Sequence, residues 1–143
     1  MELTVDKKRM PMNLNDYQKK AMLTCMSSSE NFAYMMLNLV GEVGEFASKV
    51  AKQIRKDNVS IGCTDKCIKC DNNSFIFHDY KAKEVITNEL MLEAGDILWQ
   101  LAGLCTVMGW NLDDIAMLNL EKLEARQRAG TIDGNGDGVE RDK

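Results

Sequence analysis

The chain has 143 residues, of which 45% are hydrophobic and 28% are charged, and its formal net charge is −4. This length and composition are typical of one soluble domain over residues 1–143, and the acidic balance without a basic run argues against binding to nucleic acid or to an anionic membrane. With a single proline and 6% aromatic residues, the composition favours a mainly helical domain over a sheet sandwich with many turns.

The amino-terminal residues carry positive charges, but no apolar stretch follows them, so they do not have the pattern of a secretory signal. We therefore expect a cytoplasmic protein. Its five cysteines are then expected to be reduced or metal-bound rather than paired in disulfides.

Two helices are predicted before residue 56. Asn13 or Asn15 can cap a first helix over 16–26, and the polar run 27–31 ends it. From Phe32 to about Arg55, apolar residues recur at steps of three and four, which predicts a long second helix with one apolar stripe. The stripe consists of Met35, Met36, Leu39, Val40, Val43, Phe46, Val50 and Ile54.

The other side of this second helix carries a polar row that includes Asn38, Glu42, Glu45 and Lys49. The row is either a solvated face, in which a Glu45–Lys49 pair adds roughly a few tenths of a kcal/mol, or a functional face. The glycines at 41 and 44 favour a functional face, because each costs about 1 kcal/mol in a helix interior. They indicate close approach of another helix or of a ligand beside the carboxylates.

Residues 57–81 break the helical pattern and are predicted to form an insertion or long loop, with a short strand at Ser74–Phe77. Three cysteines and the single histidine of the chain lie in it. Their spacing fits a structural Zn²⁺ site, although a loop of free thiols is the alternative. The ligands of the zinc site would be Cys63, Cys67, Cys70 and His78.

A third helix is predicted from about Ala82 to Met108. Within this apolar run, Glu93, Asp96 and Gln100 fall on one stripe with Glu89, and no Lys or Arg follows any of them at i+4. The stripe is either the solvated edge of an amphipathic helix or a row of acids that a cation neutralises. The polar residues also make the run a poor bilayer segment, so we expect no membrane association.

Asn111 resembles the cap of a fourth helix that reaches about Arg128, and residues 129–143 form an irregular tail. The predicted class is therefore all-α, a four-helix bundle-like domain with the cysteine-containing insertion between its second and third helices.

If the second and third helices are antiparallel, Glu42 and Glu45 lie opposite Glu93 and Asp96. Four carboxylates suit a hard cation such as Mg²⁺, which keeps several waters and bridges to phosphates. A di-iron site would instead need Glu-x-x-His pairs, and the predicted helices contain no histidine. Magnesium is thus the preferred metal, with Mn²⁺ as the alternative.

The runs Asn38–Lys52, Asn88–Leu104 and Gly109–Gln127 together resemble the MazG-like, all-α nucleoside triphosphate pyrophosphohydrolases. The resemblance implies that the E-x-x-E and E-x-x-D carboxylates bind Mg²⁺ and serve catalysis, and that residues of the last helix contact phosphates. The chain departs from the family pattern at Gly41, where a second glutamate is common, and in the longer spacing from Glu45 to Glu93. The implied catalytic and metal residues are Glu42, Glu45, Glu93 and Asp96, and the implied phosphate-binding residues are Lys122, Arg126 and Asn119 nearby.

The implied reaction converts an NTP or dNTP and water to NMP and pyrophosphate. Lys49 is a further residue expected to neutralise phosphate charge, and Trp99 or Trp110 can stack on the base or pack in the core. Stripes this apolar predict a homodimer or homotetramer. The alternatives are a non-catalytic helical protein that assembles with itself or a partner, and a hydrolase of another nucleotide phosphoanhydride.

Overall fold

A computed structural model describes the backbone of residues 11–56, 59–61, 75–77 and 80–131, and the side chains of 11–56 and 86–131. The described residues form four α-helices, one short 3₁₀-helix and a two-stranded antiparallel hairpin, which confirms the predicted all-α class. The hairpin lies in the insertion and pairs Val59 with Phe77, so the expected strand at 74–77 has a partner. The elements are α1 (Leu14–Met22), η1 (Ser27–Ser29), α2 (Phe32–Arg55), β1 (Val59–Ile61), β2 (Phe75–Phe77), α3 (Tyr80–Val107) and α4 (Leu112–Ala129).

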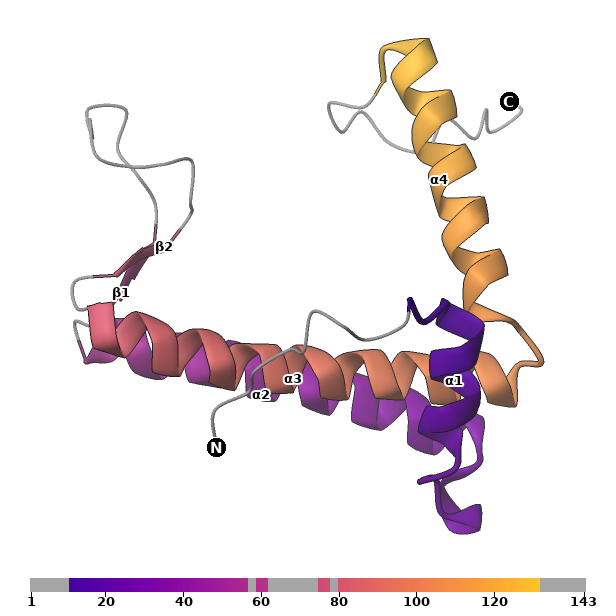
Figure 1. Ribbon diagram of the computed structural model, residues 1–143, viewed down its shortest axis with the longest axis horizontal. Coiled ribbons are helices and arrows are strands. Elements are labelled where there is room, and N and C mark those ends of the chain that lie inside the picture. Colours follow the sequence, from indigo (N-terminus) through magenta and orange to yellow (C-terminus); the bar gives the residue numbers. More distant parts are fainter. Residues whose placement is uncertain (1–10, 57–58, 62–74, 78–79, 132–143) are drawn as a thin grey trace, which may run out of the picture.

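The helices α2 and α3 pack side by side along most of their length, and α1 crosses the end where α2 begins and α3 finishes (Figure 1). From that same end, α4 runs away from the pair and contacts α1 (Figure 1). The predicted four-helix bundle is therefore not closed within the described part of one chain.

Asparagine side chains cap the N-termini of α1 and α2. Asn13 Oδ1 accepts a hydrogen bond of 2.7 Å from the backbone N–H of Asp16, and Asn31 Oδ1 accepts one of 2.9 Å from that of Tyr34. The second helix has the predicted bounds. The first helix ends at Met22, four residues before the predicted end, where the indole of Trp99 donates to the carbonyl oxygen of Ala21.

The turn between α3 and α4 depends on Gly109, whose φ of 70° is left-handed. Beyond it, the start of α4 is capped by α1. Gln18 Oε1 accepts from the N–H of Leu112 at 2.9 Å, and Asn15 Oδ1 accepts from that of Asp113 at 3.1 Å. Asn111 occupies the predicted cap position, and its side-chain amide donates to Asp114 at 3.0 Å instead of bonding to the helix backbone.

The close approach of α2 and α3 occurs at Gly103 and not at the two glycines of α2. A Cβ at Gly103 would overlap the sulfur and terminal methyl of the fully buried Met35. By contrast, a Cβ at Gly41 or Gly44 would meet nothing within 4 Å. Within the part of the chain that the structure describes, neither a helix nor any other segment lies against Gly41 or Gly44, so the expected close approach of another helix or of a ligand stays a prediction.

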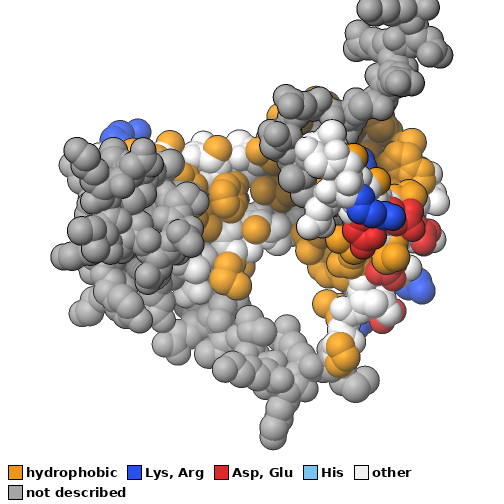
Figure 2. Space-filling view, turned by 90° about the horizontal axis from the view of Figure 1, so that it is seen from above, with side chains coloured by type: hydrophobic (Ala, Val, Ile, Leu, Met, Phe, Trp, Pro, Cys, Tyr) orange, Lys and Arg blue, Asp and Glu red, His pale blue; other side chains and the backbone are white. Residues whose placement is uncertain are grey.

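The polar row of α2 faces α3, and its apolar stripe is only partly covered by the described chain. The polar row, which includes Glu42 and Lys49, is half-buried on the side of α3. Much of the apolar stripe is exposed, with Val40 at 67% and Val43 at 50%. Figure 2 shows that hydrophobic side chains are open to solvent on the face seen from above. Few hydrophobic residues are buried among the described side chains: Met35, Ile86, Ala102, Cys105 and Leu112. The last three form one cluster, with Tyr17, Met22, Leu101 and Ile115 packed against it.

Candidate active site

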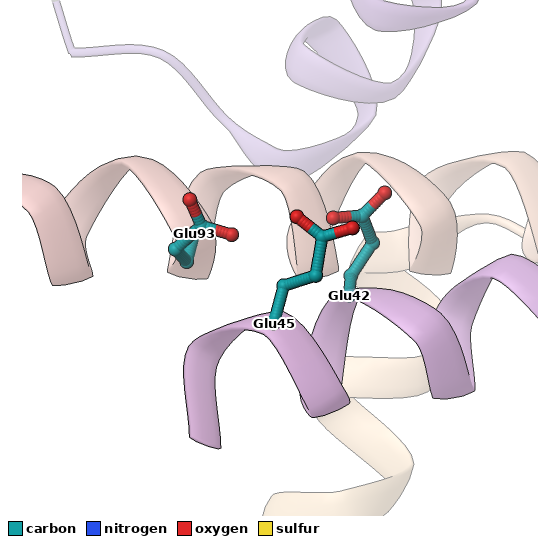
Figure 3. A group of neighbouring side chains, drawn as sticks. All are labelled: Glu42, Glu45 and Glu93. Atoms are coloured by element: carbon teal, nitrogen blue, oxygen red, sulfur yellow. The ribbon is translucent and has the colours of Figure 1, made fainter. Parts of the chain in front are cut away.

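Three of the predicted acidic residues converge between α2 and α3. Glu42 and Glu45 rise from successive turns of α2 toward α3, where Glu93 lies beside them (Figure 3). One carboxylate oxygen of each lies within 4.8 Å of the others. This spacing follows from the E-x-x-E pattern, because residues three apart stand on one face of a helix.

Glu93 is the most enclosed of the three, at 8% exposure. Its Oε1 lies 2.8 Å from the Nζ of Lys49, so Lys49 pairs across to α3. This hydrogen bond is the main reason why the pKa of Lys49 is raised, and the negative charges of Glu93, Glu89 and Glu45 add to it. A buried carboxylate needs such a counter-charge, and Lys49 supplies it in the absence of a metal ion.

Asp96 is exposed and lies outside the tight group of three, but its charge acts on Glu42. The pKa of Glu42 is raised, first by burial and then by the negative charges of Asp96, Glu45 and Glu93. The four predicted carboxylates therefore repel one another, and Lys49 compensates only one of them directly. A divalent cation between them would relieve this repulsion.

The donor set fits a hard divalent cation. Carboxylate oxygens from two helices are the ligands that Mg²⁺ or Mn²⁺ prefers, and Mg²⁺ usually keeps further coordination positions for waters and phosphate oxygens. Among the described side chains, no histidine accompanies the glutamates as a di-iron site would require.

The predicted phosphate-binding residues of α4 are not brought to the carboxylates by their own chain. Lys122 and Asn119 are exposed on α4, Arg126 is half-buried there, and α4 points away from the α2–α3 pair (Figure 1). The predicted zinc ligands Cys63, Cys67, Cys70 and His78 lie outside the described residues, so the zinc site stays a prediction.

The two tryptophans have different surroundings. The Nε1 of Trp99 donates to the carbonyl of Ala21 and to the Oγ1 of Thr24, at 3.1 and 3.0 Å, which makes it a link between α3 and α1. Trp110 is 46% exposed in the turn before α4. Trp110 is thus the more exposed of the two.

Sequence reasoning missed Tyr17, which α1 places close to the acids. Its pKa is raised, mainly by burial and further by the negative charge of Asp96. Tyr17 looked like part of an ordinary apolar face, and only the crossing of α1 over α3 brings it to this end of the site.

Comparison with known proteins agrees with this geometry. A family model described as "MazG nucleotide pyrophosphohydrolase domain" matches residues 30–131, which include α2, α3 and α4 but not α1. The "Gene 37 protein" of Mycobacterium phage L5 is 31% identical over 110 residues, covering 77% of this chain and 78% of the phage protein. No solved structure gave a significant match.

Proposed function

The chain belongs to the MazG nucleotide pyrophosphohydrolase family, and on that basis we propose that it hydrolyses an NTP or dNTP to NMP and pyrophosphate with Mg²⁺ or Mn²⁺. The observation that carries the proposal is the convergence of Glu42, Glu45 and Glu93 beside Asp96. This cluster lies within the matched residues 30–131, which favours a hydrolase over a non-catalytic helical protein.

In the proposed reaction, the oxygen of a water molecule forms a bond to the α-phosphorus, and the bond from that phosphorus to the bridging oxygen of the β-phosphate breaks. Mg²⁺ bound to the carboxylates would polarise the phosphoryl oxygens and offset the charge of the leaving pyrophosphate. One carboxylate positions the water and accepts its proton. Lys49, which pairs with Glu93, would neutralise phosphate charge in this proposal.

The test is the release of pyrophosphate from a panel of NTPs and dNTPs, with Mg²⁺, with Mn²⁺ and with a chelator. We expect turnover of at least one nucleotide to pyrophosphate and NMP, and loss of that turnover when the metal is removed. Release of orthophosphate instead would indicate hydrolysis of another phosphoanhydride, the second reading of this site. Absence of turnover across the panel would refute the proposal.

We also propose that the active form is a homodimer or homotetramer in the cytoplasm. The exposed apolar face of α2, which includes Leu37, Val40 and Val43, is far too apolar to face water, and the open space at Gly41 and Gly44 permits a second helix to approach closely. The helix α4 likewise exposes apolar side chains, Leu118 at 62% among them, which a second copy would cover in the proposed assembly. It could supply Lys122, Arg126 and Asn119 to the carboxylates of its neighbour.

The segment Ile86–Val107 of α3 is long and apolar enough to cross a membrane, and 28% of it is buried within the chain. The same segment carries Glu93 and Asp96 and packs against α2. Charged residues facing a bundle interior fit a protein partner better than lipid. We therefore propose that a second copy, rather than a membrane or nucleic acid, covers the exposed face.

Sedimentation at micromolar concentration should give a species of two or four chains. Leu37→Glu places a charge in the centre of the apolar face, and we expect it to weaken assembly at least about tenfold, a loss of about 1.4 kcal/mol. Lys20→Glu introduces the same side chain at an exposed position on α1 and should leave assembly unchanged. A stable wild-type monomer would contradict this proposal.

A further inference from the structure

Gln100 has an unusual environment for a buried amide. The residue is 4% exposed, and its Oε1 accepts no hydrogen bond; it is the only buried side-chain oxygen or nitrogen without a partner among the described residues. An unpaired buried acceptor carries a cost in the folded state, which a methionine of similar shape would avoid. A buried acceptor without a partner in the chain indicates that a ligand supplies the hydrogen-bond donor when it binds.

Its position suggests what that partner is. Gln100 follows Asp96 by one turn on the stripe that also carries Glu93, about 6 Å further along the helix axis. The next turn holds Gly103, which packs on Met35. Gln100 thus lies at the end of the carboxylate cluster nearest to α1, where Tyr17 also comes close to Asp96. The distance along α3 from Asp96 to Gln100 is comparable to the distance that the ribose puts between the α-phosphate of a nucleotide and its base.

We propose that Gln100 is a specificity-determining residue that accepts a hydrogen bond from an N–H group of the nucleobase. The inference rests on the proposed function, because the carboxylates must hold the phosphates for the base to reach Gln100. A buried acceptor such as the Oε1 of Gln100 rejects a base without the matching donor, since the acceptor is then left unpaired. Gln100 would therefore select among bases, whereas the carboxylates would bind the phosphates of any nucleotide through the metal ion.

The first test measures binding, so that it does not depend on turnover. Wild type, Gln100→Met and the control Gln127→Met, an exposed glutamine on α4, are titrated with the α,β-methylene analogues of the NTP panel in Mg²⁺. We expect Gln100→Met to bind the preferred nucleotide at least about tenfold more weakly, the loss of one good hydrogen bond. The control should bind as wild type does.

The second test removes the donor from the ligand instead. The comparison uses the preferred base and its analogue without the N–H group, such as purine riboside for adenosine or 2-pyrimidinone riboside for cytidine. Wild type should bind the analogue about tenfold more weakly than the preferred base. Gln100→Met should bind the two with equal affinity, because the substitution and the analogue remove the same hydrogen bond. Two independent, additive losses would overturn the proposal.

Stability and assembly provide the remaining controls. Gln100→Met, which no longer buries an unpaired acceptor, should melt a few degrees higher than wild type; Gln100→Leu repeats the test if the methionine variant does not fold. Weaker assembly with unchanged base discrimination would mean that a second copy supplies the donor, and would overturn the proposal. Binding of every nucleotide with equal affinity by wild type would also overturn it. Base-selective binding that depends on Gln100 without any turnover would refute the proposed hydrolysis and leave the role of Gln100 intact.

Discussion

Glu42→Gln and Asp96→Asn are each expected to lower kcat/KM for metal-dependent pyrophosphate release by at least about a hundredfold. Both substitutions keep the size of the side chain and remove its charge, so that the site loses a hard ligand and one of the groups that can accept a proton. Replacing a residue that only hydrogen-bonds to a metal ligand already lowers metal affinity or activity about 10- to 100-fold. A ligand itself should cost more.

The matched control is Glu124→Gln, which removes a carboxylate of the same kind from the exposed face of α4, where it pairs with Arg128 at 3.7 Å. Its kcat/KM should stay within about twofold of wild type, because surface pairs contribute little to structure. Full activity of Asp96→Asn would exclude Asp96 from the site and leave only the group of Glu42, Glu45 and Glu93. Equal losses in all variants, including the control, would point to a general effect on folding.

The positions of the long helices were predictable because each carries a sustained three-and-four-residue pattern. The bounds of α2 were predicted correctly, and α3 begins two residues before the expected start. The convergence of Glu42, Glu45 and Glu93 was also predictable, since a motif with spacing three fixes a common face and two antiparallel helices bring two such faces together.

The burial of the two faces of α2 was not predictable. An apolar stripe shows that a surface must be covered, but periodicity does not say whether the same chain or another copy covers it. The stripe that includes Val40 and Val43 was predicted to need a cover, and part of it is exposed in the single chain, while the row with Glu42 and Lys49 faces α3. Glycines 41 and 44 are exposed and meet no other part of the described chain, so the close approach that they indicate stays a prediction.

Contacts between distant parts of the chain were also beyond the sequence. The cap of α4 comes from Gln18, which is 94 positions from Leu112, and no local pattern reveals such a partner. The same holds for Lys49, whose side chain lies four residues from Glu45 on one helix but bonds to Glu93 on the other. For Gln100, the sequence showed a polar residue on the acidic stripe, but only the structure shows that its acceptor is buried without a partner.

The second large effect concerns stability, and it follows from the raised pKa of Glu42. A carboxyl whose pKa is higher in the folded than in the unfolded chain binds its proton more tightly when folded. Its stabilising contribution is therefore complete below the ordinary pKa of about 4.5 and is lost as pH rises through the raised pKa. At neutral pH and without metal, the negative charge of Glu42 therefore lowers the free energy of unfolding.

We accordingly expect metal-free Glu42→Gln to melt at a higher temperature than metal-free wild type at pH 7, with the difference disappearing near pH 4, where Glu42 is protonated in both states. Millimolar Mg²⁺ should stabilise wild type, by about 2.7 kcal/mol at a hundredfold excess over its Kd. Glu42→Gln should respond much less, because it lacks one ligand. The measurement is thermal unfolding of both proteins at the two pH values, with Mg²⁺ or chelator. If Mg²⁺ raises both melting temperatures equally, the ion binds elsewhere, and if the metal-free variant melts lower at pH 7, the repulsion between Glu42 and its acidic neighbours is not what limits the stability of this site.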